Sequence, residues 1–194
     1  MRPPVFADRT TAAVSAATAA GLVALVASDL LTRPAEGDRV ADAGTGPAVA
    51  CAIAASVACS AATLLGGGRR TLSRRQPSFR AGVSLTWAGM ALNRWGRRTL
   101  GPAYRPVVTV LDDHEVVVRG PYRIVRHPMY AGTTVLCLGL GATVGSWPAS
   151  LAWVLPPLAL LRRIRVEEEV LSRSLGARYE AYAGGRARLV PGVW

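Results

Sequence analysis

The sequence predicts an all-α protein, a polytopic membrane helical bundle of about five spans with a helical hairpin in its C-terminal half. Three observations favour this fold class. Half of the residues are hydrophobic (51%) and 18% are charged, which leaves too little polar surface for a soluble domain of 194 residues. Two long apolar runs lie in the N-terminal half. A third run, residues 127–161, contains no Asp, Glu, Lys or Arg.

The first two apolar runs are each long enough to cross a membrane. Residues 11–31 carry a single charge, Asp29, and residues 43–68 carry none. At about 1.5 Å per residue, either run as a helix spans the roughly 30 Å of a hydrocarbon core. Arg2 and Arg9 give the first run the charge order of a signal peptide, but the run is too long and has no clean cleavage site. We therefore expect a retained span.

A shorter apolar piece follows at residues 81–93 and is closed by Arg94, Arg97 and Arg98. It can cross the membrane only if these arginines extend their side chains to the interface. The positive-inside rule assigns the basic segments on both sides of it to the cytoplasm, which a single span between them forbids. Either residues 69–80 lie on the outer face, or 81–93 is re-entrant.

The uncharged run at 127–161 predicts the helical hairpin. As a single helix it would be about 53 Å long, far longer than a bilayer core requires. Near its middle lies Gly145-Ser-Trp-Pro148, where Gly and Pro break a helix and Trp favours the membrane interface. We therefore expect one helix at 129–146 and a return helix at 149–162.

Both ends of such a hairpin emerge on the same side of the membrane. Two polar segments flank it, GPYRIVRHPMY at 120–130 and RRIRVEEEVL at 162–171. We expect them to form two walls of one site. The alternative is that the arginines only anchor the helix ends at the interface, and that the glutamates form a solvated helix face on which Glu169 pairs with Arg173.

Charge distribution and residue spacing argue against nucleic-acid binding and against a metal site. The net charge of +11 would suit nucleic-acid binding, but the arginines gather at the ends of apolar segments, as in proteins that face anionic lipid headgroups. We expect no nucleic-acid partner. Cys51, Cys59 and Cys137 lie in apolar stretches, and neither His114 nor His127 has a partner at ligand spacing. We expect no metal site.

The two walls carry a motif that resembles a known enzyme family. The pattern G-P-Y-R-x-x-R-H-P-x-Y-x-G precedes the hairpin, R-I-x-x-E-E-x-x-L-x-x-x-L-G-x-x-Y-x-x-Y follows it, and R-L-V-P-G closes the chain. The combination is similar to the isoprenylcysteine carboxyl methyltransferase family and to its relatives, the phospholipid N-methyltransferases. The resemblance covers residues 94–194, and residues 1–80 carry no matching motif.

The resemblance implies a membrane-embedded methyltransferase that uses S-adenosylmethionine. Residues 1–93 would form N-terminal spans, and residues 94–194 would form the catalytic region, which ends in a cytosolic helix. The active site would face the cytoplasm at a plasma membrane of the bacterial type. The expected acceptor is the carboxylate of a prenylated cysteine or a related lipid-like molecule that enters from the bilayer, with a phospholipid amine as the alternative. The oligomeric state stays open.

The cofactor suggests roles for residues on both walls. His127-Pro128 has the pattern of a helix start, because Pro is common at the first helical position. Backbone N–H groups there, with Arg123 or Arg126 nearby, can hold the carboxylate of the cofactor. Glutamates on the second wall can accept hydrogen bonds from its ribose hydroxyls or its ammonium, and tyrosines can stack on adenine or face the sulfonium. The residues expected to bind the cofactor are Tyr122, His127, Pro128, Tyr130, Gly132, Glu167, Glu168 and Tyr179.

The residues expected to be catalytic are Arg123, Arg126 and Glu168. Methyl transfer mainly requires that the acceptor be aligned and desolvated. A carboxylate acceptor is already ionised at neutral pH, and an arginine can orient it. An amine acceptor must first lose a proton, for which His127 or a glutamate is the available base. The residues themselves leave both chemistries open.

Two further hypotheses belong to other classes. Membrane reductases of the steroid and isoprenoid type have a similar hairpin and an R-H-P-x-Y element, and they would use NADPH. In those relatives we expect Asn after the Pro and an acidic residue after the Gly, where this chain has Met129 and Thr133. A non-enzymatic membrane scaffold would leave the Arg-His-Pro and Glu-Glu clusters without a purpose.

Overall fold

The computed structural model describes residues 39–40, 43–65, 76–101, 104, 109–110, 116–144 and 146–194. These residues are predominantly helical, as predicted. The helices are α2 (Thr45–Leu65), α4 (Gln76–Leu100), the 3-10 helix η3 (Gly120–Arg123), α5 (Pro128–Val144), α6 (Trp147–Ala152), α7 (Leu155–Leu175) and α8 (Ala177–Ala183). Two short strands, β1 (Arg39–Val40) and β2 (Thr109–Val110), pair antiparallel. The expected span at 11–31 lies outside the described residues.

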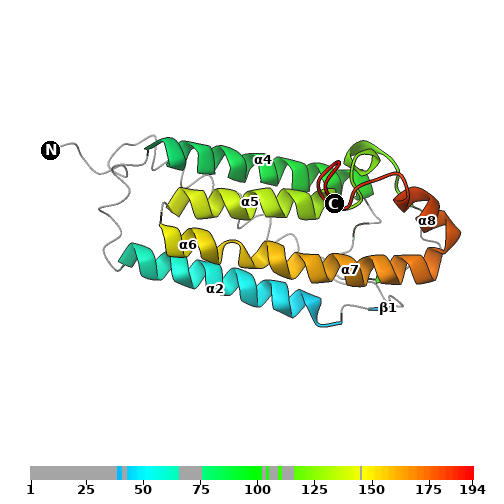
Figure 1. The fold of residues 1–194 in the computed structure, drawn as a ribbon, viewed down its shortest axis with the longest axis horizontal. Helices are drawn as coiled ribbons and strands as arrows, with labels where there is room; N and C mark the ends of the chain where they lie inside the picture. The colour runs from blue at the N-terminus through cyan, green and yellow to red at the C-terminus, as the bar shows by residue number, and fades with distance from the viewer. Residues whose placement is uncertain are drawn as a thin grey trace.

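The long helices lie side by side. In Figure 1, α4, α5, the α6–α7 pair and α2 follow one another across the molecule, and each contacts its neighbour. The short helix α8 and the C-terminus lie at the end of the bundle where α5 begins. The polar segments on either side of the hairpin therefore reach the same end.

Among the described residues, one helix is long and apolar enough to cross a membrane. It is α2, over Thr45–Thr63, which confirms the helix expected at 43–68. Only 11% of its apolar window is buried, so it differs from the core helix of a soluble protein. The helix α5 is also apolar but is 17 residues long. A bundle of about five spans stays a prediction.

The apolar piece at 81–93 lies inside a longer helix. The helix α4 is continuous over 25 residues and includes the arginines on both sides of that piece. At about 1.5 Å per residue it is about 38 Å long, which is enough to cross a hydrocarbon core. The continuous helix does not have the fold-back that a re-entrant segment needs.

The helices α4 and α5 pack with their backbones in near contact, because glycines line both surfaces. Gly82 and Gly89 lie one heptad apart on α4 and face Gly139 and Gly132, which are spaced likewise on α5. A Cβ on Gly89 would lie 2.5 Å from the carbonyl oxygen of Gly132. Small residues at a crossing let helix backbones approach this closely. Helix packing therefore accounts for a glycine at position 132. The surroundings of Gly132 give no support to its expected role in cofactor binding.

The predicted hairpin is confirmed in outline, but its return arm is not a single helix at 149–162. The helix α5 ends before the predicted Gly-Ser-Trp-Pro break, and α6 begins within it. After six residues α6 ends, and α7 begins at Leu155. The helix α7 then continues through the charged segment at 162–171. The second wall of the predicted site is therefore the far half of the return helix.

A proline explains the break between α6 and α7. Pro156 lacks the N–H that would donate to the Ala152 carbonyl in a continuous helix. The Ser56 hydroxyl of α2 lies 2.7 Å from this carbonyl and shares its proton between it and the Ala52 carbonyl of its own helix. Beside it, the Trp153 indole donates to the Ser60 hydroxyl at 3.0 Å. Side chains of α2 thus satisfy the groups at the interrupted turn, as neighbouring helices do for prolines in membrane segments.

Gly89→Ala is expected to destabilise the protein by about 1–3 kcal/mol, because the new Cβ would meet backbone atoms that cannot move aside. The measurement is thermal or denaturant unfolding in detergent. Gly185→Ala is the control, because a Cβ at Gly185 meets no atom of the described residues within 4 Å. Equal stability of the two variants would contradict the close α4–α5 crossing.

Candidate functional site

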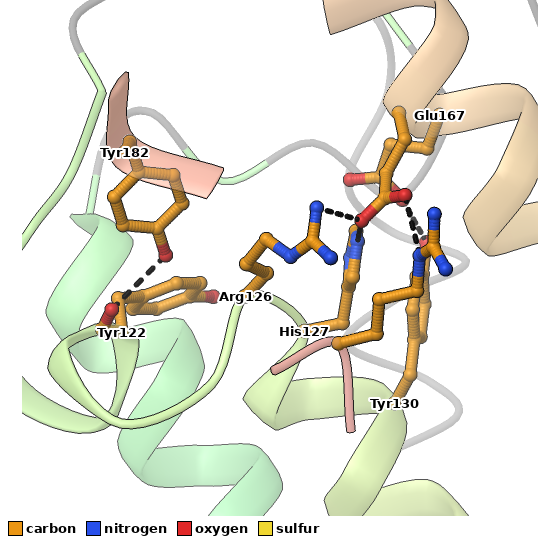
Figure 2. Close-up of polar contacts among 8 residues, drawn as sticks. Tyr122, Arg126, His127, Tyr130, Glu167 and Tyr182 are labelled. Carbon is orange, nitrogen blue, oxygen red and sulfur yellow. Dashed lines mark hydrogen bonds and ion pairs between the residues drawn. The ribbon is translucent and has the colours of Figure 1, made fainter. Parts of the chain in front are cut away.

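The two polar walls meet at the end of the bundle where α5 begins, and a third segment joins them. The first wall is η3 with the entry to α5, and the second is the far half of α7. The third is residues 186–194, which we call the C-terminal strap. Figure 2 shows Arg126 extending toward His127, with the Tyr122–Tyr182 pair on its other side.

Local sequence fixes the shape of the first wall. Gly120 has a φ of +58°, in the left-handed region that glycine adopts without strain. Pro121 lies in the first turn of η3. Pro128 occupies the first position of α5, where its missing N–H leaves no helix bond unmade, as predicted. Residues 122–127, which include Tyr122, Arg126 and His127, therefore lie between two fixed points.

The C-terminal strap pairs with the entry to α5. Val125 and Ala187 form a parallel bridge, the Arg126 N–H donates to the Ala187 carbonyl at 2.9 Å, and the His127 N–H donates to the Arg188 carbonyl at 3.0 Å. These two backbone N–H groups are thus occupied by the strap. They are therefore not available to a cofactor carboxylate, and the expected role of free N–H groups at this helix start stays a prediction for the first turn of α5.

Glu168 joins all three segments through its carboxylate, and its side chain is almost fully buried. The Arg126 guanidinium lies 2.9 Å from Oε1. His127 Nε2 lies 3.3 Å from the same oxygen. Arg188 Nε of the strap donates to Oε2 at 2.7 Å. We call Glu168, Arg126, His127 and Arg188 the Glu168 cluster.

The cluster holds Glu168 in its ionised form. Burial alone would raise the pKa of its carboxyl, but the hydrogen bonds from His127 and Arg188 and the charge of Arg126 outweigh burial and lower this pKa to about 2. An ionised carboxylate only accepts, so the proton in the His127 contact is on Nε2. At neutral pH Glu168 is therefore an anchor for cations and a weak base.

A second set of contacts lies beside the cluster. The Tyr130 hydroxyl donates to Glu167 Oε2 at 2.7 Å and accepts from Arg163 Nε at 3.0 Å. The rings of Tyr130 and His127 are stacked, with centroids 5.6 Å apart. Both predicted glutamates thus face the Arg-His-Pro segment, and neighbouring Glu169 pairs with Arg173 on the surface, as the helix spacing predicts.

Three buried polar atoms around the glutamates have no hydrogen-bond partner in the described part of the chain: the Tyr122 hydroxyl, the Tyr179 hydroxyl and Arg126 Nε. Burial, and then the charge of Glu167, raises the pKa of Tyr122. Burial, and then the charge of Glu168, raises the pKa of Tyr179, although Arg126 opposes this. Both phenols keep their protons and can donate to a ligand.

Tyr182 differs from these two tyrosines. Its hydroxyl donates to the carbonyl of Tyr122 at 3.0 Å, so its hydrogen bond is made within the protein. Its ring lies 6.1 Å from that of Tyr179, centroid to centroid. Packing between α8 and η3 therefore accounts for Tyr182, in agreement with its absence from the predicted site.

Two predicted residues lie away from the cluster. Arg123 ends η3 with an exposed side chain that forms no ion pair with the described residues. A 3-10 helix has three residues per turn, so burial of Pro121 and Tyr122 turns Arg123 outward. Gly132 is buried against α4. A catalytic role for Arg123 stays a prediction.

Sequence reasoning missed two arginines that contact the site residues. Arg163 lies in the R-I-x-x-E-E motif and is buried against Tyr130. Arg188 begins the closing R-L-V-P-G and reaches Glu168. Both belong to the recognised motif, which was the available signal. The backbone pairing that brings Arg188 to α7 has no local signature.

Comparisons with known proteins agree with the motif. Residues 78–178 match the family model for phospholipid methyltransferase. Two rice proteins, from Oryza sativa subsp. indica and subsp. japonica, are named "Probable protein-S-isoprenylcysteine O-methyltransferase", and each is 27% identical to the chain over 105 residues. The match covers 53% of this chain and 55% of each rice protein, so the chain spans about half the length of the curated relatives it matches.

Glu168→Gln is expected to lower stability at neutral pH and to have less effect in acid. The pKa of Glu168 is about 2 in the folded chain, against an ordinary value of 4.5. The ionised group therefore contributes about 3 kcal/mol above pH 4.5, and this contribution is lost as the pH falls from about 4.5 to about 2. Denaturant unfolding in detergent at several pH values measures the difference.

Glu169→Gln is the matched control for that series. It is the next residue on α7, and its ion pair with Arg173 is exposed. Such pairs contribute little, so the substitution should change stability slightly at every pH. A Glu168→Gln effect no larger than that of Glu169→Gln would count against a buried anionic cluster.

Proposed function

The chain belongs to the phospholipid methyltransferase family, and we propose that it transfers a methyl group from S-adenosylmethionine to a lipid-like acceptor at a membrane. The proposed acceptor is the carboxylate of a prenylated cysteine or a related molecule. The description of the matched family favours a second candidate, the amine of a phospholipid headgroup. Residues 94–194 would form the catalytic region.

One observation carries this proposal: partnerless buried donors surround an ionised carboxylate. The Tyr122 hydroxyl, the Tyr179 hydroxyl and Arg126 Nε are buried without partners among the described residues. Leaving such a group unsatisfied costs about 1–3 kcal/mol each, so a polar ligand that accepts from them gains affinity. S-adenosylmethionine offers a carboxylate, ribose oxygens and adenine nitrogens as acceptors, and an ammonium as a cation. The residues fit this cofactor.

The proposed contacts follow from the chemistry of each side chain. Arg126 already uses one amino group on Glu168, so its Nε is the donor for the cofactor's carboxylate. The stacked rings of His127 and Tyr130 offer a flat surface for adenine. Glu167 and Glu168 supply the negative charge that suits the ammonium and the sulfonium. The cofactor, when bound, supplies an activated methyl group.

The electrostatics of the site favour a carboxylate acceptor over an amine. An amine must lose its proton before it can attack, and Glu168, with a pKa of about 2, is a weak base at neutral pH. The His127 Nε2 proton is directed to Glu168. A carboxylate acceptor needs no base and requires only orientation and desolvation. Arg163, buried against Tyr130, is a further cation at the hairpin side of the site.

A membrane location is part of the proposal. The helix α2 is a candidate span with little of its apolar window buried. Large apolar side chains are also exposed along one stretch of α6 and α7, at Trp147, Leu151, Leu155 and Leu158. Within each helix the two residues are three or four positions apart and so share a helix face, which suits contact with lipid. We propose several spans, including residues 11–31, and a site on the cytoplasmic side of a plasma membrane.

The cofactor proposal is tested with labelled S-adenosylmethionine and purified protein in detergent. Tyr122→Phe and Tyr179→Phe should each weaken binding by about 3- to 10-fold, because each removes one donor. Tyr122→Phe should not lower stability, because the Tyr122 hydroxyl has no hydrogen-bond partner among the described residues. Tyr182→Phe is the control, and it should lower stability and leave affinity unchanged.

Failure of the wild-type protein to bind S-adenosylmethionine would refute the cofactor, and tight binding of NADPH would favour a reductase. Transfer of label to a prenylated cysteine in lipid vesicles identifies the carboxylate acceptor. Transfer to a phospholipid amine instead identifies the second candidate.

A further inference from the structure

The C-terminal strap lies outside the residues matched by the family model, yet it supplies one of the cations on Glu168. The family model ends at residue 178. The strap begins after α8 and returns to the entry of α5, where two backbone hydrogen bonds hold it. Arg188 lies beside this pairing and has its side chain on α7. A segment beyond the residues matched by the family model thus reaches the centre of the site.

The two oxygens of the Glu168 carboxylate are held from different sides. Arg126 and His127 share Oε1, at 2.9 Å and 3.3 Å. Among the described residues, Arg188 is the one cation on Oε2, at 2.7 Å, the shortest contact of the three. Without Arg188, one oxygen of a buried carboxylate would have no cation on it, and the carboxylate could rotate about its last bond. Arg188 therefore determines the direction in which Oε1 faces Arg126.

Arg188 is itself fixed by the end of the strap. Its guanidinium carbon lies 5.1 Å from the centroid of the Trp194 ring, a cation–π contact. The backbone N–H groups of Leu189 and Val190 donate to the Trp194 carbonyl, at 2.9 Å and 3.1 Å. This closed turn keeps the tryptophan ring against the guanidinium. Trp194 thus acts on Glu168 through Arg188.

We propose that Arg188 is a positioning residue of the cofactor site, which fixes the Glu168 carboxylate so that Arg126 presents its free Nε edge to the bound cofactor. Trp194 holds Arg188 for this purpose. The inference rests on the proposed function, because it assigns the cofactor's carboxylate to Arg126. Arg188 does not touch the cofactor in this arrangement.

The proposal predicts how binding depends on pH. The charged and titratable groups that face Glu168 are Arg126 and His127 at the α5 entry, Tyr179 on α8 and Arg188 on the strap. Removing Arg188 removes one of the hydrogen bonds that lower the pKa of Glu168, so this pKa rises toward its ordinary value of 4.5. As the pH falls toward that value, Glu168 becomes protonated and releases Arg126.

The test compares cofactor affinity across pH for matched strap variants. Arg188→Gln should weaken S-adenosylmethionine binding about tenfold near neutral pH. It should weaken binding further as the pH falls to about 5, relative to the wild-type protein. Arg188→Lys should recover part of the affinity, because it retains a charged donor. Arg186→Gln is the control, because Arg186 lies on the same strap and donates to the Tyr182 carbonyl instead.

Identical affinities and pH profiles for Arg188→Gln and Arg186→Gln, with normal binding by the wild-type protein, would overturn the positioning role and leave the proposed function intact. Failure of the wild-type protein to bind the cofactor would overturn both. If Arg188→Gln does not fold, Trp194→Leu decides, because it keeps Arg188 and the backbone acceptor at residue 194. Unchanged affinity in Trp194→Leu would then overturn the proposal.

Discussion

A single buried carboxylate joins three segments of this protein that are separate in sequence. Glu168 is 7% exposed, and a charge at that depth is stable only with cationic partners and hydrogen bonds. The partners come from the entry to α5 and from the C-terminal strap, while Glu168 itself belongs to α7. Loss of any one partner leaves the charge partly unmatched. The three segments therefore depend on one another.

The helical scaffold delivers these segments to one end of the bundle. Glycines at the α4–α5 crossing set α5 close against α4. Asn93 of α4 then fixes the first turn of α5, because its side-chain amide donates to the Met129 carbonyl and to Thr133. On the other side, Pro156 interrupts the return arm and Ser56 of α2 satisfies the freed carbonyl. The direction of α7, and hence of its glutamates, follows from that interruption.

The parts of the fold that have a local cause could be predicted from the sequence. The absence of charge over 127–161 and the Gly-Ser-Trp-Pro break predicted the hairpin, and His127–Pro128 predicted a helix start. The break at Pro156 also has a local cause, and the predicted single return helix did not take account of it. The predicted hairpin also led to the prediction that Glu167 and Glu168 face the Arg-His-Pro segment.

The parts that depend on distant contacts could not be predicted. Gly132 matched a functional motif, but its burial against α4 is visible only once the two helices are packed. The outward direction of Arg123 depends on burial of its neighbours in η3. The place of Arg188 beside Glu168 depends on backbone pairing between residues 125–127 and 187–188. No sequence pattern encodes that pairing.

A double-mutant cycle on Arg126 and Glu168 tests the buried ion pair most directly. Arg126→Gln, Glu168→Gln and the double variant would be unfolded in detergent at neutral pH, with the exposed Glu169–Arg173 pair as the reference cycle. A buried pair predicts a coupling free energy of about 1–3 kcal/mol, against about 0.5 kcal/mol or less for the exposed pair. Additive effects of Arg126→Gln and Glu168→Gln on the free energy of unfolding would contradict a stabilising interaction between the two buried charges.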